Sequence, residues 1–371
     1  MDRWRKSLIG FGLLALLAGL PLILSGRQEP QVGARLVALA GEAGDAQAAG
    51  FRRVTGPAPL AFPAAHGPHL DYQTEWWYYT GNLVAEGGQR FGYQLTFFRR
   101  ALIAPAERNE RQSAWAADQV YMAHLALTDV DDRRFRAFER FARGAAGLAG
   151  ATAAPFHVWL DDWQAEEVAP GVTHLQAAHE GLALDLLLTD RKGPSLHGDR
   201  GYSPKGAQPG KASLYYSLTR LETSGTVQAG VKAHAVAGLS WMDHEWSTSG
   251  LAADQVGWDW FSIQMDDGSE LMVFQLRRAD GTIDPFSSGT LIAADGSTRH
   301  FERDAFEIRV EEVWRSPHTG AGYPARWSVV VPAASLHLAI EPLLADQELG
   351  LSYAYWEGAV QVEGERAGQA V

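Results

Sequence analysis

The chain has 371 residues, of which 46% are hydrophobic and 20% are charged, and this composition excludes wholesale disorder, a collagen-like repeat and a polytopic membrane protein. Lys and Arg number 32 against 44 Asp and Glu, so the formal charge of −12 argues against a nucleic-acid partner. The absence of cysteine excludes disulfides, thiolate nucleophiles and Cys-ligated metal centres.

The N-terminus carries the pattern of an export signal. A basic stretch precedes an uncharged apolar run over residues 8–24, as in the charged and apolar regions of a secretory signal. Because this run is at the short limit for a membrane-spanning helix, an uncleaved anchor that associates the chain with a membrane is the alternative. We therefore predict an exported, periplasmic or secreted protein with a signal peptide or anchor over residues 1–26. Residues 27–58, rich in Ala and Gly, are predicted to be a tether.

From Glu75 onward, short runs of aromatic and β-branched residues recur between Gly, Asp and Pro clusters, a pattern typical of antiparallel sheets. The predicted strands span residues 75–85, 90–100, 119–130, 156–168, 182–190, 214–221, 231–246, 257–266, 270–278, 306–314, 326–331 and 352–362. These are too many for one small closed barrel, which is filled at about eight strands. We predict an all-β fold of two consecutive antiparallel β-barrels, over residues 59–248 and 249–371. Residues 191–211 are predicted to form a loop across a barrel mouth.

The densest group of chemically capable side chains lies at residues 240–246, followed by 257–261. Strand alternation places Met242, His244 and Trp246 on one face, and Trp241, Asp243 and Glu245 on the other. A carboxyl held among Trp rings is desolvated and stays protonated near neutral pH, and aromatic faces stabilise a cation. This combination suits protonation of an alkene, whereas an ordinary acidic pair beside core Trp residues is the alternative interpretation.

A second aromatic group lies at residues 71–82, where Trp76, Tyr78 and Thr80 share one face and Glu75, Trp77 and Tyr79 the other. One face is predicted to line a cavity for a long apolar ligand, and a buried central strand is the alternative. A third group, residues 353–358, repeats the aromatic and carboxylate theme around Trp356.

The remaining signals are weaker. His124 lies in a strand interior, where it is either a core residue or part of a site. His66 and His69 have no third ligand at a defined spacing, so no metal site is predicted. The sequence contains no nucleophile elbow, P-loop or dinucleotide-binding fingerprint.

Residues 71–83, 215–220, 238–247 and 257–264 resemble the carotenoid 1,2-hydratase family, which also includes AttH-like proteins often labelled secreted hydrolases. The resemblance covers roughly residues 50–365. It implies two lipocalin-like β-barrel domains and addition of water to a terminal isoprenoid double bond without a cofactor. It also implies that His244 and Trp246 are the important His-x-Trp pair of the hydratases.

The sequence thus predicts a cofactor-independent hydratase or lyase that acts on a hydrophobic, isoprenoid or lipid-like alkene. Asp259 is the predicted acid, with Asp243 or Glu245 as alternatives, and His244 would orient the acid or activate water. The predicted substrate-binding residues are Trp246, Trp258, Trp260, Trp241, Trp76, Tyr78, Tyr216, His124 and Trp356. The alternative is a non-catalytic lipocalin-like carrier of a hydrophobic ligand in the cell envelope. A hydrolase is a third hypothesis, but it lacks an identifiable nucleophile.

Overall fold

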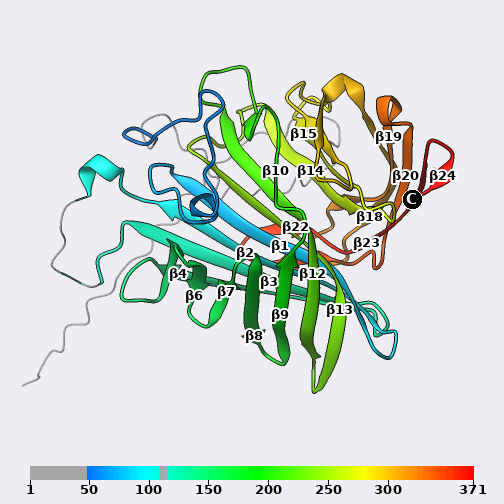
Figure 1. Ribbon diagram of the computed structural model, residues 1–371, viewed down its shortest axis with the longest axis horizontal. Coiled ribbons are helices and arrows are strands. Elements are labelled where there is room, and N and C mark those ends of the chain that lie inside the picture. The colour runs from blue at the N-terminus through cyan, green and yellow to red at the C-terminus, as the bar shows by residue number, and fades with distance from the viewer. Residues whose placement is uncertain (1–47, 109–112, 114) are drawn as a thin grey trace, which may run out of the picture. The chain divides into compact units, whose positions relative to one another are not determined.

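The computed structural model describes residues 48–108, 113 and 115–371, and nearly all of their regular secondary structure is β-strand (Figure 1). The predicted signal peptide or anchor and residues 27–47 of the predicted tether lie outside them. Within the described residues, no helix is long and apolar enough to span a membrane. Residues 48–58 pack onto the body, with Phe51 and Val54 buried.

The first two-thirds of the body form one large antiparallel sheet with the strand order β4-β3-β2-β1-β13-β12-β9-β8-β7-β6-β5, and β10 and β11 also pair with β12. Its strands are β1 (Thr74–Ala85), β2 (Arg90–Ala101), β3 (Gln119–Asp129), β4 (Arg134–Arg143), β5 (Ala149–Ala153), β6 (Phe156–Leu160), β7 (Trp163–Ala169), β8 (Val172–His179), β9 (Leu182–Asp190), β10 (Pro194–Leu196), β11 (Tyr202–Pro204), β12 (Ala212–Ala229) and β13 (Lys232–Ser247). The sheet curls into a nearly closed barrel around an apolar core.

The rest of the body contains three smaller sheets. They comprise β14 (Gln255–Gln264), β15 (Glu270–Arg278), β16 (Ser288–Ile292) and β17 (Thr298–Glu302); β18 (Glu307–Arg315), β19 (Gly322–Val331), β20 (Leu336–Pro342), β23 (Val360–Arg366) and β24 (Gln369–Ala370); and β21 (Glu348–Gly350) with β22 (Ala354–Trp356). The first two sheets share a second apolar core that includes Leu271, Val273, Val329 and Ile340. Short 3-10 helices are η1 (Ala64–His66), η2 (Pro105–Glu107), η3 (Arg303–Ala305) and η4 (Pro332–Ala334).

The predicted all-β, lipocalin-like fold class is confirmed, but some strands differ from the sequence prediction. Strand β4 has no predicted counterpart, because four Arg and one Glu among its ten residues obscure the β-pattern of a strand at the end of the sheet order. The predicted strand over 352–362 is interrupted at residues 357–359. Strand β14 pairs with β15 rather than with β13, so the two Trp-rich strands belong to different sheets.

A buried ion cluster joins the large sheet to the smaller sheet of β14–β17. Glu270, fully buried on β15, accepts from Lys192 Nζ at 2.7 and 2.8 Å and from Arg220 Nε at 2.5 Å. Thr219 Oγ1 adds a further hydrogen bond of 3.1 Å. Both cations come from the large sheet or the loop beside it, so one carboxylate fixes the two sheets against each other.

We expect Glu270→Gln to lower the free energy of unfolding by about 3–5 kcal/mol, because it leaves two largely buried cations without their carboxylate. The matched control is Glu222→Gln, which removes the carboxylate of an exposed pair with Arg191 and should change stability by less than about 1 kcal/mol. Urea unfolding of both variants measures the difference. Equal losses would contradict a joining role for Glu270.

Candidate active site

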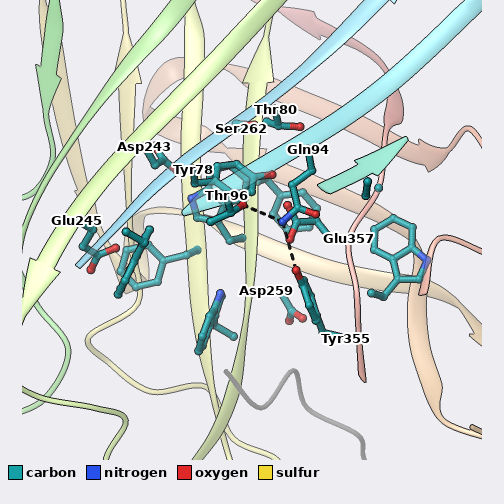
Figure 2. A pocket seen from close by; sticks show the side chains of 18 of the residues that line it. Tyr78, Thr80, Gln94, Thr96, Asp243, Glu245, Asp259, Ser262, Tyr355 and Glu357 are labelled. Carbon is teal, nitrogen blue, oxygen red and sulfur yellow. Dashed lines mark hydrogen bonds between the residues drawn. The ribbon is translucent and has the colours of Figure 1, made fainter. Parts of the chain in front are cut away.

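A cavity of about 340 Å³ lies between the large sheet and the smaller sheets (Figure 2). Its walls come from β1, β2, β3, β12 and β13 on one side, and from β14, β15, β19 and residues 355–360 on the other. Aromatic lining residues include Trp76, Tyr78, Phe98, Tyr215, Trp258, Trp260, Phe274, Trp327, Tyr355 and Trp356. The cavity therefore offers an extended π-surface to a ligand, as expected for an apolar molecule.

One row of polar side chains crosses six neighbouring strands on the cavity face of the large sheet. Directly opposed residues of an antiparallel pair point to the same face, so each pairing carries the row to the next strand. In the order β4, β3, β2, β1, β13 and β12, the row consists of Glu139, His124, Thr96, Tyr78, Asp243 and Ser217. Strand register thus brings together residues that are far apart in the sequence.

The C-terminal segment 353–359 supplies two more groups to this row. Tyr355 Oη lies 2.7 Å from a nitrogen of His124, and Glu357 is hydrogen-bonded to Tyr78. Gly92 permits the close approach, because a Cβ added there would lie 2.4 Å from Cβ of Ala359. The segment is therefore positioned by direct packing on β2.

Asp243 is a buried carboxyl whose pKa is raised. Its Oδ1 accepts hydrogen bonds from Ser217 and, at 2.7 Å, from Trp241 Nε1. Burial nevertheless raises the pKa of Asp243 to about 7, because desolvation outweighs these hydrogen bonds. On the far side of Ser217, His197 Nε2 lies 2.6 Å from the hydroxyl.

Glu357 is the second such carboxyl. Burial, reinforced by the nearby charge of Asp243, raises the pKa of Glu357 to about 7 against the hydrogen bond from Tyr78. Its Oε1 is buried and has no hydrogen-bond partner among the described residues. Glu357 therefore presents one free oxygen and a proton that it retains up to neutral pH.

The other two carboxylates of the cavity have cationic partners. Lys205 Nζ lies 3.5 Å from Glu245, and Arg277 Nε lies 3.5 Å from Asp259, which also accepts from Gln275 at 2.8 Å. Asp243 and Glu357, whose pKa values are raised, thus differ from the two carboxylates that are paired with a cation.

The structure separates the residues predicted from the sequence into three locations. The cavity lining includes Asp243, Glu245, Asp259, Trp76, Tyr78, Trp258, Trp260 and Trp356. Two residues contact lining groups, since Trp241 donates to Asp243 and His124 bonds to Tyr355. His244, Trp246 and Tyr216 lie on the opposite face of the sheet, as alternation predicts for the first two. The structure therefore does not bring His244 to the carboxyls that it was predicted to orient.

His244 belongs instead to a buried polar network inside the large sheet. Glu75 accepts hydrogen bonds of 2.8 Å from Arg99 Nε and from one ring nitrogen each of His69 and His244. The other His244 nitrogen lies 3.2 Å from the Tyr216 hydroxyl. Burial lowers the pKa of His244 to about 4, so its ring is neutral.

This network bears on metal binding, because ligand atoms of His69, Glu75 and His244 lie within 4.8 Å of one another. A metal would have to displace the imidazole protons that Glu75 now accepts and would sit beside the Arg99 guanidinium. His69 and His244 already donate to Glu75, so the geometry of the three side chains fits a structural network better than a metal site.

Four residues of the site have no predicted role: Glu357, Tyr355, Lys205 and Glu139. Glu357 and Tyr355 lie in the third aromatic group of the sequence, and Lys205 lies in the predicted 191–211 loop, so both regions carried a signal. Glu139 lies on β4, the strand hidden by its charged residues.

The raised pKa of Glu357 predicts a stability change with a defined sign. Because the folded state keeps a proton that the unfolded chain releases near pH 4.5, the contribution of Glu357 to stability falls as the pH rises from about 4.5 to about 7. Glu357→Gln removes this titration, so above pH 7 we expect the variant to be more stable than wild type by on the order of 2–3 kcal/mol. The gain should vanish near pH 4, as followed by urea unfolding.

Glu348→Gln is the control of opposite sign. Although burial raises the pKa of Glu348, hydrogen bonds from Ser316, Thr319 and Tyr323 hold it below its usual value. This substitution should destabilise the protein at neutral pH. A loss of stability in Glu357→Gln at pH 8 would contradict a protonated, desolvated Glu357.

Comparison with known proteins places this cavity in a family context. The model of the AttH-like family matches residues 53–371. A solved AttH-type protein from Nitrosomonas europaea is 35% identical, with a TM-score of 0.76 over 86% of this chain and 96% of that one. A kievitone hydratase from Nectria haematococca, 11% identical, shares the fold with a TM-score of 0.64 over 86% of this chain and 92% of that one. No curated protein matches the chain. The predicted family is confirmed, and the chain belongs to the AttH-like family.

Proposed function

We propose that the protein is a cofactor-independent enzyme that hydrates or isomerises a carbon–carbon double bond of a hydrophobic, isoprenoid or lipid-like substrate. The observation that carries the proposal is the pair Asp243 and Glu357, two carboxyls that stay protonated near neutral pH in an aromatic cavity. The name of the kievitone hydratase, which shares the fold, supports hydration as the reaction class. The basic and apolar N-terminal residues support export.

Glu357 is the proposed acid, because it lines the cavity and its Oε1 has no hydrogen-bond partner among the described side chains. Its O–H bond breaks as a C–H bond forms at one alkene carbon, which leaves a carbocation at the other. The Tyr78 hydroxyl remains on the resulting carboxylate and stabilises it. A carboxyl with a pKa near neutrality is both protonated and able to release its proton at that pH.

The aromatic lining stabilises the carbocation. Trp260 packs edge-on against Tyr78, with ring centroids 5.3 Å apart, and its Nε1 donates to Tyr215 at 3.1 Å. These contacts hold the rings in fixed positions before substrate arrives, and π-faces attract a cation. The cation then takes up water to give an alcohol, or loses a neighbouring proton to give an isomer.

Asp243 acts as the partner of the acid. Ser217, Trp241 and Tyr215 all donate hydrogen bonds to its carboxyl, whereas Glu357 has a free Oε1, so Asp243 is less suited than Glu357 to give its proton to a substrate. When Asp243 is ionised, its charge raises the pKa of Glu357, and the two carboxyls therefore compete for ionisation. Asp259, predicted from the sequence as the acid, is paired with Arg277 and is less suited to donate a proton.

The experiment uses isotope labels, because labelled products can then be detected without knowing the substrate in advance. Purified protein is incubated with a total lipid extract of its own cells, once in D₂O and once in H₂¹⁸O, and all extract components are followed by mass spectrometry. Hydration introduces both labels into one component, and isomerisation introduces deuterium alone. We expect wild type to label at least one component, and Glu357→Gln to lower the rate by about 10²–10⁴-fold.

Asp259→Asn is the matched control, since it alters a cavity carboxylate that is not the proposed acid, and it should still label the component. If Asp259→Asn loses labelling and Glu357→Gln keeps it, the proton donor is Asp259 and not Glu357. No labelling by wild type, with a component that co-purifies unchanged, would favour the carrier.

A further inference from the structure

A chain of three side chains leads from the cavity to the protein surface, on the side of the row away from Asp243. Tyr355 Oη lies 2.7 Å from His124 Nδ1, and His124 Nε2 lies 3.1 Å from Glu139 Oε2. Tyr355 lines the cavity, His124 is fully buried, and the Glu139 side chain is 12% exposed. The chain thus connects the cavity with solvent through two hydrogen bonds.

The protonation states fix the direction of these hydrogen bonds. Although burial raises the pKa of Glu139, hydrogen bonds from His124 and Ser352 hold it below its usual value, so this side chain is a carboxylate and accepts. Burial lowers the pKa of His124, so the ring is neutral and has one N–H. That hydrogen must lie on Nε2 to reach Glu139, so Nδ1 accepts from the Tyr355 hydroxyl.

The same arrangement leaves one acceptor position on Tyr355. Gln94 Nε2 donates to Tyr355 Oη at 3.2 Å, so the amide occupies one lone pair of that oxygen. The hydroxyl hydrogen points to His124, and the second lone pair remains for a donor in the cavity. Figure 2 shows the amide of Gln94 between Thr96 and Tyr355, with a hydrogen bond to each.

We propose that Tyr355 is the catalytic base that removes a proton from the water attacking the carbocation, with His124 and Glu139 as the relay that takes the proton away. The inference rests on the proposed hydration and completes it. As the oxygen of water bonds to carbon, one of its O–H bonds breaks and the proton passes to Tyr355 Oη. The original hydroxyl proton of Tyr355 moves to His124 Nδ1.

The resulting imidazolium is stabilised by the carboxylate of Glu139. Because both proton movements occur together, Tyr355 need not become a phenolate, which burial makes unfavourable by raising its pKa well above its usual value. The proton leaves through His124 to solvent, and Glu357 regains its own proton from solvent. One water is consumed for each alcohol formed, and no other reactant is needed.

Tyr355→Phe removes the hydroxyl and keeps the ring, and Tyr353→Phe is the matched control. Tyr353 stacks on Tyr355 with ring centroids 5.5 Å apart, and its buried hydroxyl has no hydrogen-bond partner among residues 48–108, 113 and 115–371. Both variants are incubated with the total lipid extract in D₂O and in H₂¹⁸O. We expect Tyr355→Phe to lower ¹⁸O incorporation by about 10²-fold or more while deuterium incorporation falls much less, because Glu357 still protonates the alkene. Tyr353→Phe should match wild type in both labels.

Each outcome decides between the two proposals. If wild type incorporates neither label, the proposed function fails and the relay fails with it. If wild type incorporates both labels and Tyr355→Phe retains ¹⁸O incorporation, only the relay is overturned. Deuterium uptake without ¹⁸O in wild type also overturns it, because no water is then activated.

Glu139→Gln separates a proton relay from a structural contact through the pH profile. The groups that face His124 are Glu139 from β4 and, from the C-terminal segment, Tyr353 and Tyr355, while β2 contributes Thr96 and Phe98, which do not titrate. Protonated His124 cannot accept a proton, so the rate of ¹⁸O incorporation falls on the acid side as His124 titrates.

Because the carboxylate raises the pKa of His124, its removal should move this acid limb to lower pH and reduce the maximal rate about tenfold. The alkaline limb, set by Glu357, should stay in place. An unmoved acid limb, or equal displacement of both limbs, would overturn the relay.

Discussion

The register of the central strands β1, β2 and β13 is the constraint on which the site depends. Tyr78 pairs with Thr96 on one side and with Asp243 on the other. The register of these strands therefore determines which side chains form the polar row on the cavity face. A slip of β13 by one residue would turn Asp243 and Glu245 into the barrel core and His244 toward the cavity. Such a slip would place the carboxyls of Asp243 and Glu245 in an apolar core and leave Glu357 without Asp243 beside it in the cavity.

The inner face of these strands packs in the barrel core and opposes the slip. On the inner face Trp77, His244 and Tyr216 are in register across β1, β13 and β12. Glu75 adds a fully buried ion pair with Arg99, also between opposed residues. Breaking a buried pair leaves an uncompensated charge, so the inner network stabilises one register strongly. The residues that resemble the His-x-Trp pair of the hydratases thus have a clear structural role behind the cavity.

The sequence predicts the part of this site that depends on a single strand, and not the part that depends on pairing between strands. Alternation within one strand is a local property, and it correctly assigned the two faces of residues 241–246 and of 76–80. Pairing between distant strands is not local, and nothing in the sequence places Glu139 and His124 in one row with Asp243. The predicted strand over 352–362 also concealed the irregular residues 357–359, where Glu357 lies. The predicted acid, Asp259, has the right aromatic neighbours, but its pairing with Arg277 comes from the adjacent strand β15.

The polar groups of the cavity come both from the large sheet and from the smaller sheets. The large sheet alone would offer Asp243 and Tyr78, and the smaller sheets alone would offer the paired Asp259. Residues 355–357 complete the arrangement, since they bring Tyr355 to His124 and Glu357 to Tyr78 on one short segment. Because the proposed acid and the proposed base are two residues apart on that segment, any change in its packing on β2 alters both proton transfers together. Hydration requires one proton to be given and another to be taken at nearby points, and a single short segment that packs on the row of polar side chains brings both groups to one place.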